Sequence, residues 1–336
     1  MIGLLVVGYL IWHVGFGAVV SAVLQIGWPG FALLCGLGLA LFGLLGSAWR
    51  VLVTRPGAQT WRIFVWARMV RDSAAETLPF SQIGGFVIGA RAAIVEGIAP
   101  PVAAASMIAD ITTEMVAQLV YVCLGIALLG AAMRRPAAGI PSTGSLVTGI
   151  SLAVIAAASF YALQRYGSGM IRFFIARFLP QVLEHADAVT SELQAIYRAP
   201  GRITASFLLH VLGWFASGAS TWIAFRLLGA DVGLSSVIAI DSLVYAIRSV
   251  AFAVPNALGV QEAAYLVFAP VLGVGPEIAI AVSLLKRARD IAIGIPVLLI
   301  WQTREGQRAL VAARPESVST TPAAFGPPPR DGEVEL

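Results

Sequence analysis

The sequence predicts an all-α polytopic membrane protein in which inverted repeats place two broken, re-entrant hairpins around a cavity near the membrane midplane. Charged residues make up only 12% of the 336 residues and hydrophobic residues 58%, whereas about 25% of a soluble domain is charged. Long apolar runs recur along most of the chain, and the mean hydropathy is +0.86. Two of these runs are interrupted by proline, glycine and hydrogen-bonding residues. Irregular backbone of this kind survives in a membrane only where it is buried in protein or lines a wet cavity.

The two interruptions have the same composition. The first is Leu78-Pro79-Phe80-Ser81-Gln82-Ile83-Gly84-Gly85-Phe86, and the second is Val254-Pro255-Asn256-Ala257-Leu258-Gly259-Val260-Gln261-Glu262. Pro255 follows Pro79 by 176 positions, and the same spacing relates Gly97 to Gly273, Pro100 to Pro276 and Glu114 to Asp290. Because membrane transporters are often built from internal repeats, we interpret the match as a duplication, with chance similarity as the alternative.

The apolar runs around these breaks predict the membrane spans. We expect spans at residues 30–49, 102–132, 145–163, 203–227 and 277–301, with residues 232–253 leading into the second break. Three spans separate the two hairpins, and an odd number of crossings puts the second hairpin on the opposite face of the membrane. The repeats would then be inverted, which is the arrangement used for alternating access.

Basic residues predict which side is cytoplasmic. Arg50, Arg55, Arg62, Arg68 and Arg71 form a cluster that should face the cytoplasm. Residues 60–76 contain part of this cluster and are amphipathic. This pattern predicts either an interfacial helix or the descending arm of a hairpin. Residues 164–203 are also amphipathic and are expected to lie on the cytoplasmic face. They would join repeat halves of about 28–163 and 204–303 within one membrane domain, residues 1–303. Residues 304–336 predict a disordered cytoplasmic tail, because they are rich in Pro, Ser, Thr and acidic residues.

Several charges are predicted to lie inside the membrane. Asp110 and Glu114 share one face of the helix after the first break, and Lys286, Arg287 and Asp290 lie on the equivalent helix after the second. Each such charge costs at least about 2.5–3.5 kcal/mol near the bilayer centre. One interpretation is a structural ion network, for example Lys286 with Asp290 and Arg287 with Asp110 or Glu114. The other is a polar pathway for a lipid headgroup or a coupling ion, and the two are compatible.

The hairpins carry further polar candidates. Arg91 and Arg248 can hold an anionic group, or they can pair with Glu96 and Asp241. Polar side chains at the breaks can hydrogen-bond a hydroxylated ligand, although broken helices also need such groups for their own backbone. The candidate substrate-binding and translocation residues are Pro79, Ser81, Gln82, Gly84, Gly85, Arg91, Asp110, Glu114, Arg248, Pro255, Asn256, Gly259, Glu262, Lys286, Arg287 and Asp290.

The sequence does not indicate a metal, cofactor, catalytic or nucleic-acid site. Cys35 and Cys123 both lie in apolar runs, and the three histidines are scattered singly, so we expect no metal and no cofactor. No nucleophile–base pair is recognisable, so we predict no catalytic residue. The net charge of +4 is what cytoplasmic loops require and does not indicate nucleic acid binding.

The interrupted segments also carry a family resemblance. The first, continued by Gly89-Ala90-Arg91-Ala92, resembles the hopanoid-biosynthesis-associated branch of the lysylphosphatidylglycerol synthase transmembrane-region superfamily. Residues 255–262 and the charged residues 283–290 resemble the proline-glycine-glutamate signature of that superfamily and the helix that follows it. The resemblance covers most of residues 2–304.

The resemblance implies a multi-pass protein of the bacterial inner membrane, with a cytoplasmic C-terminus, that translocates lipids or helps to export them. The implied partner is a membrane lipid, a hopanoid or a phospholipid, together with other lipid-export or hopanoid enzymes. Enzymes of the wider superfamily attach a soluble aminoacyl-transferase domain, whereas this chain ends in the Pro-rich tail, so we expect the flippase-like module without the synthase activity. The alternatives are a lipid-modifying membrane enzyme and an accessory scaffold for hopanoid enzymes.

Overall fold

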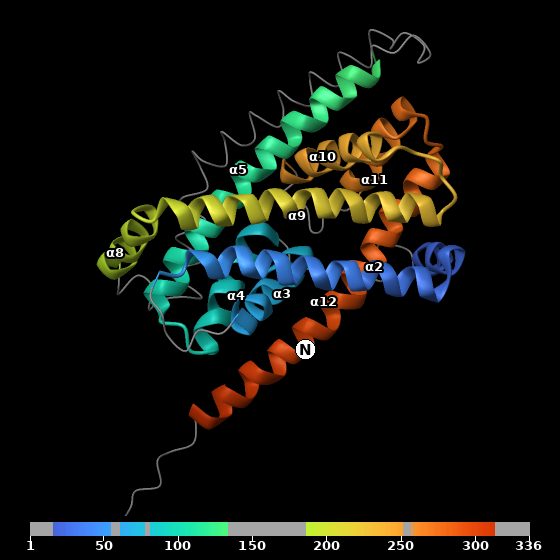
Figure 1. Cartoon of the computed structure of the whole chain (residues 1–336). Coiled ribbons are helices and arrows are strands. Elements are labelled where there is room, and N and C mark those ends of the chain that lie inside the picture. Colours follow the sequence, from blue (N-terminus) through green and yellow to red (C-terminus); the bar gives the residue numbers. More distant parts are fainter. Residues whose placement is uncertain are drawn as a thin grey trace, which may run out of the picture.

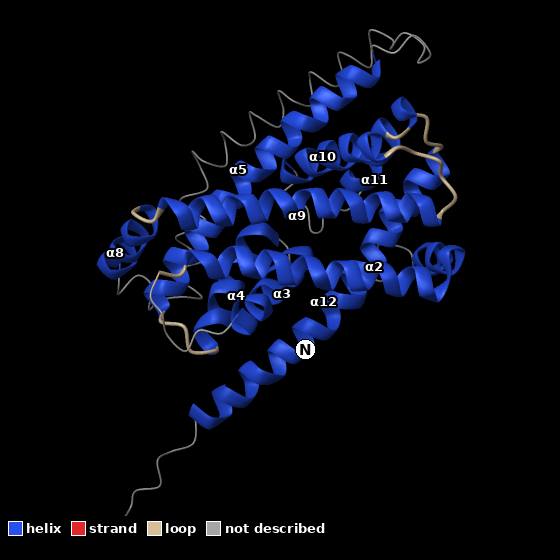
Figure 2. Cartoon of the chain, viewed as in Figure 1, coloured by secondary structure: helices blue, strands red, loops and turns tan. Residues whose placement is uncertain are grey.

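The computed structural model describes residues 16–54, 61–77, 81–133, 186–250, 257 and 259–312, and every regular element in these ranges is a helix (Figures 1 and 2). The helices are α2 (Phe16–Leu52), α3 (Trp61–Thr77), α4 (Ser81–Val95), α5 (Pro100–Met133), α8 (Ala186–Tyr197), α9 (Pro200–Leu227), α10 (Leu234–Val250), α11 (Val260–Phe268), the 3-10 helix η2 (Pro270–Leu272) and α12 (Pro276–Ala312). The all-α prediction is confirmed for this part of the chain.

Within the described ranges, three helices are long and apolar enough to cross a membrane. They cover Val20–Leu52, Pro100–Ala131 and Pro200–Leu227, and so contain or match three of the predicted spans. The predicted span 145–163 lies outside the described residues. The predicted span 277–301 lies within α12. The charged residues in the middle of α12 make this helix less apolar than the other three, so it is not counted with them.

Helices α2 and α9 lie side by side and run in opposite directions (Figure 1). Gly30 of α2 packs against Leu227 at the end of α9, while Arg202 at the start of α9 donates a hydrogen bond to the carbonyl of Val53 (2.7 Å) just after α2. The pair α3–α4 follows the end of α2, and the pair α10–α11 follows the end of α9. The two pairs therefore lie toward opposite ends of the α2–α9 pair.

The two short arms, α4 and α11 with η2, end in the same way. Each is followed by a glycine with positive φ, Gly97 (98°) and Gly273 (81°), and the next helix then begins at Pro100 or Pro276. In both, the glycine N–H and the N–H after it bond back to carbonyls three and five residues earlier, as helix C-caps do. These bonds are Gly97 to Ile94 (2.9 Å), Ile98 to Ala93 (3.1 Å), Gly273 to Pro270 (3.1 Å) and Val274 to Ala269 (3.0 Å). Each bond in one half has its equivalent 176 positions later in the other.

Helix α3 packs along α4, the next helix in the chain, as the hairpin alternative for residues 60–76 expects. The two helices pack closely because Gly85 and Gly89 of α4 present no side chain toward α3. The breaks themselves are only partly described. Pro79, Pro255 and Asn256 lie outside the described residues, while Ser81 and Gln82 are the first residues of α4.

Alanine at Gly85 is expected to lower the thermal unfolding midpoint. Its Cβ would lie 2.7 Å from the carbonyl oxygen of Arg71 and 2.8 Å from the Cβ of Ala75, and overpacking of this kind costs about 1–3 kcal/mol. The matched control is Gly84→Ala, because a Cβ there meets no atom within 4 Å. Both variants gain the same helix propensity, so equal midpoints in a thermal scan of the purified protein would contradict the prediction.

The last described helix continues beyond the expected start of the C-terminal tail. Helix α12 continues to Ala312, so residues 304–312 are helical and do not belong to a disordered tail; residues 313–336 lie outside the described part. Of the connecting segment 164–203, the structure describes α8 and the start of α9. Glu192 and Ile196 of α8 are buried, and α8 packs against α5 and α9.

Candidate functional site

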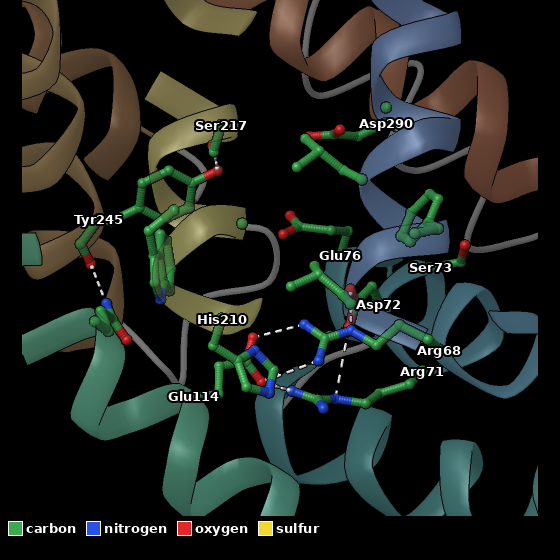
Figure 3. Close-up of a pocket in the computed structure, with 18 of the residues that line it drawn as sticks. Arg68, Arg71, Asp72, Ser73, Glu76, Glu114, His210, Ser217, Tyr245 and Asp290 are labelled. Atoms are coloured by element: carbon green, nitrogen blue, oxygen red, sulfur yellow. Dashed lines mark hydrogen bonds and ion pairs between the residues drawn. The ribbon is translucent and has the colours of Figure 1, made fainter. Parts of the chain in front are cut away.

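A cavity of about 250 Å³ lies between seven helices, α2, α3, α4, α5, α9, α10 and α12 (Figure 3). Helix α2 contributes only apolar side chains and one glycine to its wall. Helix α4 contributes only Phe86, and α3, α5, α9, α10 and α12 supply the polar lining. These polar residues are Arg68, Arg71, Asp72, Ser73, Glu76, Glu114, Gln118, His210, Ser217, Tyr245, Arg248, Ser249, Arg289 and Asp290.

One wall of the cavity is an ion network between α3 and α5. Arg68 Nη2 lies 2.6 Å from Glu114 Oε1, and Arg71 Nη1 lies 2.8 Å from Asp110 Oδ2. Arg71 also bonds Glu114, and Arg68 Nε bonds Asp72 Oδ2 at 2.8 Å. The spacing works because residues three or four apart share a helix face. Arg68 and Arg71, which belong to the basic cluster expected on the cytoplasmic side, are both buried because Asp110 and Glu114 bind them inside the bundle.

Helix α9 adds His210 to this network. Its Nε2 lies 2.9 Å from Asp110 Oδ1, and both side chains are fully buried. One turn earlier, the hydroxyl of Ser206 lies 3.0 Å from that of Thr113. Sequence reasoning passed over His210 as an isolated histidine. The available signal was an ionisable residue inside an apolar span, which is by default a functional candidate.

A second buried ion pair lies in the other half of the chain. Lys286 Nζ of α12 lies 2.8 Å from Asp241 Oδ1 of α10. Thr221 donates to the same carboxylate (2.8 Å), as does Tyr121 (3.2 Å), and Tyr265 accepts from Lys286 (3.2 Å). Neither Lys286 nor Asp241 lines the cavity. This cluster therefore holds five helices together without facing the cavity.

Residues of the second break cross-link α11 to α12. Arg287 Nε bonds Glu262 Oε1 (2.6 Å), and its Nη2 bonds the carbonyl of Ala257 (3.3 Å). Glu262 also accepts from the backbone N–H of Gly259 (2.9 Å), which caps the start of α11 from the third residue of that helix. Gln261 bonds Ser283 Oγ (2.8 Å). These contacts bind the described residues of the break to one another and to α12.

An ion pair also connects the two halves. Glu76, near the end of α3, accepts from Arg248 of α10, with both carboxylate oxygens 2.7 Å from Nη2. The Nη1 of Arg248 bonds Gln261 of α11 (2.6 Å). Glu76 and Arg248 both line the cavity. The two hairpins thus meet at a charged contact in its wall.

The expected ion pairings are wrong in their partners. Lys286 pairs with Asp241, Arg287 with Glu262, and Asp290 with its neighbour Arg289. Arg248 pairs with Glu76 and not with Asp241. Arg91 pairs with Glu305 and not with Glu96, whose partner is Arg304. Sequence spacing finds partners within one helix, whereas here most partners come from helices far apart in the chain.

The structure therefore divides the sequence-predicted site residues into groups. Glu114, Arg248 and Asp290 line the cavity, and Asp110 lies directly behind the first of them. Those that do not line it are Gly84, Gly85, Arg91, Gly259, Glu262, Lys286 and Arg287. The side chains of Ser81 and Gln82 are not described. In the described ranges, no group of three or more His, Cys, Asp and Glu side chains could hold a metal ion.

Long apolar helices that surround a buried, charged cavity define a polytopic helical membrane protein. Residues 1–297 match the family described as "Lysylphosphatidylglycerol synthase TM region", and the chain belongs to this family. Searches of the curated proteins and of the solved structures return no match. The family indicates a function that involves membrane lipids.

Proposed function

We propose that the protein translocates a lipid across the bacterial inner membrane, or hands it on for export, and that the lipid is a hopanoid. The observation that carries this proposal is a cavity with charged walls that reaches the exposed surface of an apolar helix. Two residues that line the cavity, Met115 of α5 and Ser249 of α10, are exposed. Close to Met115 on α5, Leu119 is 65% exposed, as a lipid-facing residue would be.

The size of the cavity suits a polar headgroup. Sites for drug-sized molecules occupy roughly 300–1,000 Å³, so about 250 Å³ leaves the apolar body of a lipid outside. That body would remain in the bilayer, and the headgroup would enter through a gap that opens between α5 and α10 when the lipid binds. Hydroxyls of Ser217, Tyr245 and Ser249 and the amide of Gln118 line the same space and can bind a hydroxylated headgroup.

Inverted repeats would let the cavity open alternately to the two faces of the membrane. The matching C-caps at Gly97 and Gly273 support a duplication, and the opposite directions of α2 and α9 support its inversion. Helix α4 has 15 residues and α11 has nine, whereas about 20 are needed to span a bilayer. We therefore assign them as re-entrant arms. The C-terminus is proposed to be cytoplasmic, with no enzymatic activity and with lipid-export or hopanoid enzymes as partners.

Closing the gap between α5 and α10 is expected to stop lipid movement. Gln118 Nε2 already bonds Ser249 Oγ across it (2.7 Å). A Gln118→Cys/Ser249→Cys variant, with Cys35→Ala and Cys123→Ser, would be joined by a short, reducible thiol cross-linker. Labelled hopanoid and labelled phospholipid are then followed from leaflet to leaflet in proteoliposomes. Movement should fall to the level of empty liposomes and return after reduction.

The single variant Gln118→Cys, treated with the same reagent, separates closure of the gap from chemical modification. Unchanged movement in the cross-linked protein would exclude this route. No movement above empty liposomes with any lipid would reject translocation and favour the scaffold. A new lipid product in extracts of the same vesicles would favour a lipid-modifying enzyme.

A further inference from the structure

His210 is an ionisable residue of the cavity wall. Its bond to Asp110 uses only one of its two ring nitrogens, so the ion network does not account for the other. Asp110 accepts hydrogen bonds from Arg71 (2.8 Å) and Arg68 (3.3 Å) on one oxygen, so its other oxygen also acts as an acceptor. His210 Nε2 must therefore donate to that oxygen. In the neutral ring this leaves Nδ1 as the basic nitrogen, and Nδ1 is buried without a hydrogen-bond partner in the described structure.

The charges around His210 are unbalanced by one. Two guanidiniums, of Arg68 and Arg71, face the three carboxylates of Asp72, Asp110 and Glu114. With His210 neutral and all three carboxylates ionised, this cluster carries one excess negative charge, and protonation of Nδ1 would balance it. Burial of an unpaired charge is costly, so the cluster favours an extra proton. Figure 3 shows His210 beside Glu114, facing the ends of the two arginines.

The other helices packed against α9 do not supply this missing charge. Helix α2 offers only apolar side chains and a glycine to the cavity, and α8 contributes none of its lining. Helix α10 places Tyr245 and Arg248 in the wall, but Arg248 is bound to Glu76. Helix α12 places Arg289 there, paired with its neighbour Asp290.

We propose that His210, positioned by Asp110, is a proton-binding site that couples movement of the lipid headgroup to the proton gradient; this rests on the proposed function. Nδ1 takes up a proton from water that reaches the cavity from one face, and it releases the proton after the hairpins rearrange. The proton changes the net charge of the wall that Glu114 presents to the headgroup. Binding of the headgroup and of the proton are thereby linked, as reciprocity requires.

The site is tested first without any lipid assay. Protein with ¹⁵N-labelled histidine and with His13→Gln and His185→Gln has a single imidazole, His210. Its signal is followed while the pH is lowered from about 8 to about 5 and should show the uptake of one proton, and Asp110→Asn should change this response because it removes the carboxylate that positions the ring. A ring that keeps one protonation state throughout this range would overturn the proposal, independently of any result on lipid movement.

The coupling is tested in proteoliposomes with an imposed difference of one pH unit. In the wild type the gradient should change the ratio of labelled lipid between the leaflets by up to about tenfold, the factor that one proton per lipid can supply. In His210→Gln, the lipid movement that remains should not respond to the gradient. Lipid movement in the wild type that ignores the gradient would reject the coupling alone. No movement with or without the gradient would reject the proposed function and the coupling together.

Discussion

Replacement of Lys286 by methionine is expected to lower the free energy of unfolding by roughly 3–5 kcal/mol, the usual cost of leaving one member of a buried ion pair alone. Asp241 is fully buried and takes its charge compensation from Lys286 at 2.8 Å. Without the ammonium, the hydroxyls of Thr221 and Tyr121 cannot neutralise the carboxylate. The thermal midpoint in detergent should fall by more than about 6 °C.

Two further variants show whether the ion pair is the cause. Lys286→Met with Asp241→Asn removes both charges and keeps an acceptor for Tyr121 and Thr221, so most of the lost stability should return. Arg226→Met breaks a 2.5 Å pair with Asp231 whose members are 49% and 99% exposed, and it should cost less than about 1 kcal/mol. If the double variant is no more stable than Lys286→Met alone, Lys286 contributes through its packing and not through its charge.

The sequence predicts the helices well and their charge partners poorly. Prolines, glycines and apolar runs are local features, which is why the starts of α5 and α12 and three long spans are found where expected. The spacing of Asp110 and Glu114 also places both on one helix face, as the structure has them. Ion pairing depends on which helices pack together, and this cannot be read from one helix at a time.

Two cases illustrate that limit. Arg68 and Arg71 have the spacing and surroundings of a basic cytoplasmic cluster, yet they are buried because α3 packs between other helices and both side chains bind carboxylates of α5. Lys286 and Arg287 are adjacent in sequence but point to different partners, Asp241 on α10 and Glu262 on α11. A helical rotation of 100° per residue separates them, so only knowledge of both neighbouring helices would distinguish their roles.

Loss of the Glu76–Arg248 contact is expected to lower the rate of lipid movement by about 10–100-fold. This pair joins α3 to α10 in the cavity wall, and Arg248 also bonds Gln261 of the second hairpin. Energetic coupling between two such elements is typically 1–3 kcal/mol, or 5–150-fold. In Arg248→Gln the hairpins no longer hold each other, so the conformation with a formed cavity becomes less populated. Initial rates in proteoliposomes measure the effect.

Arg91→Gln is the matched control for this variant. Arg91 also joins two helices through a glutamate, Glu305, but it is 42% exposed at the side chain and does not line the cavity. Its removal should leave the rate within about twofold of wild type, since an exposed pair contributes little. Glu76→Gln should reproduce the defect of Arg248→Gln, because each breaks the same contact from the other side. Equal losses in the Arg91 and Arg248 variants would mean that helix pairing in general, and not the contact between the hairpins, limits lipid movement.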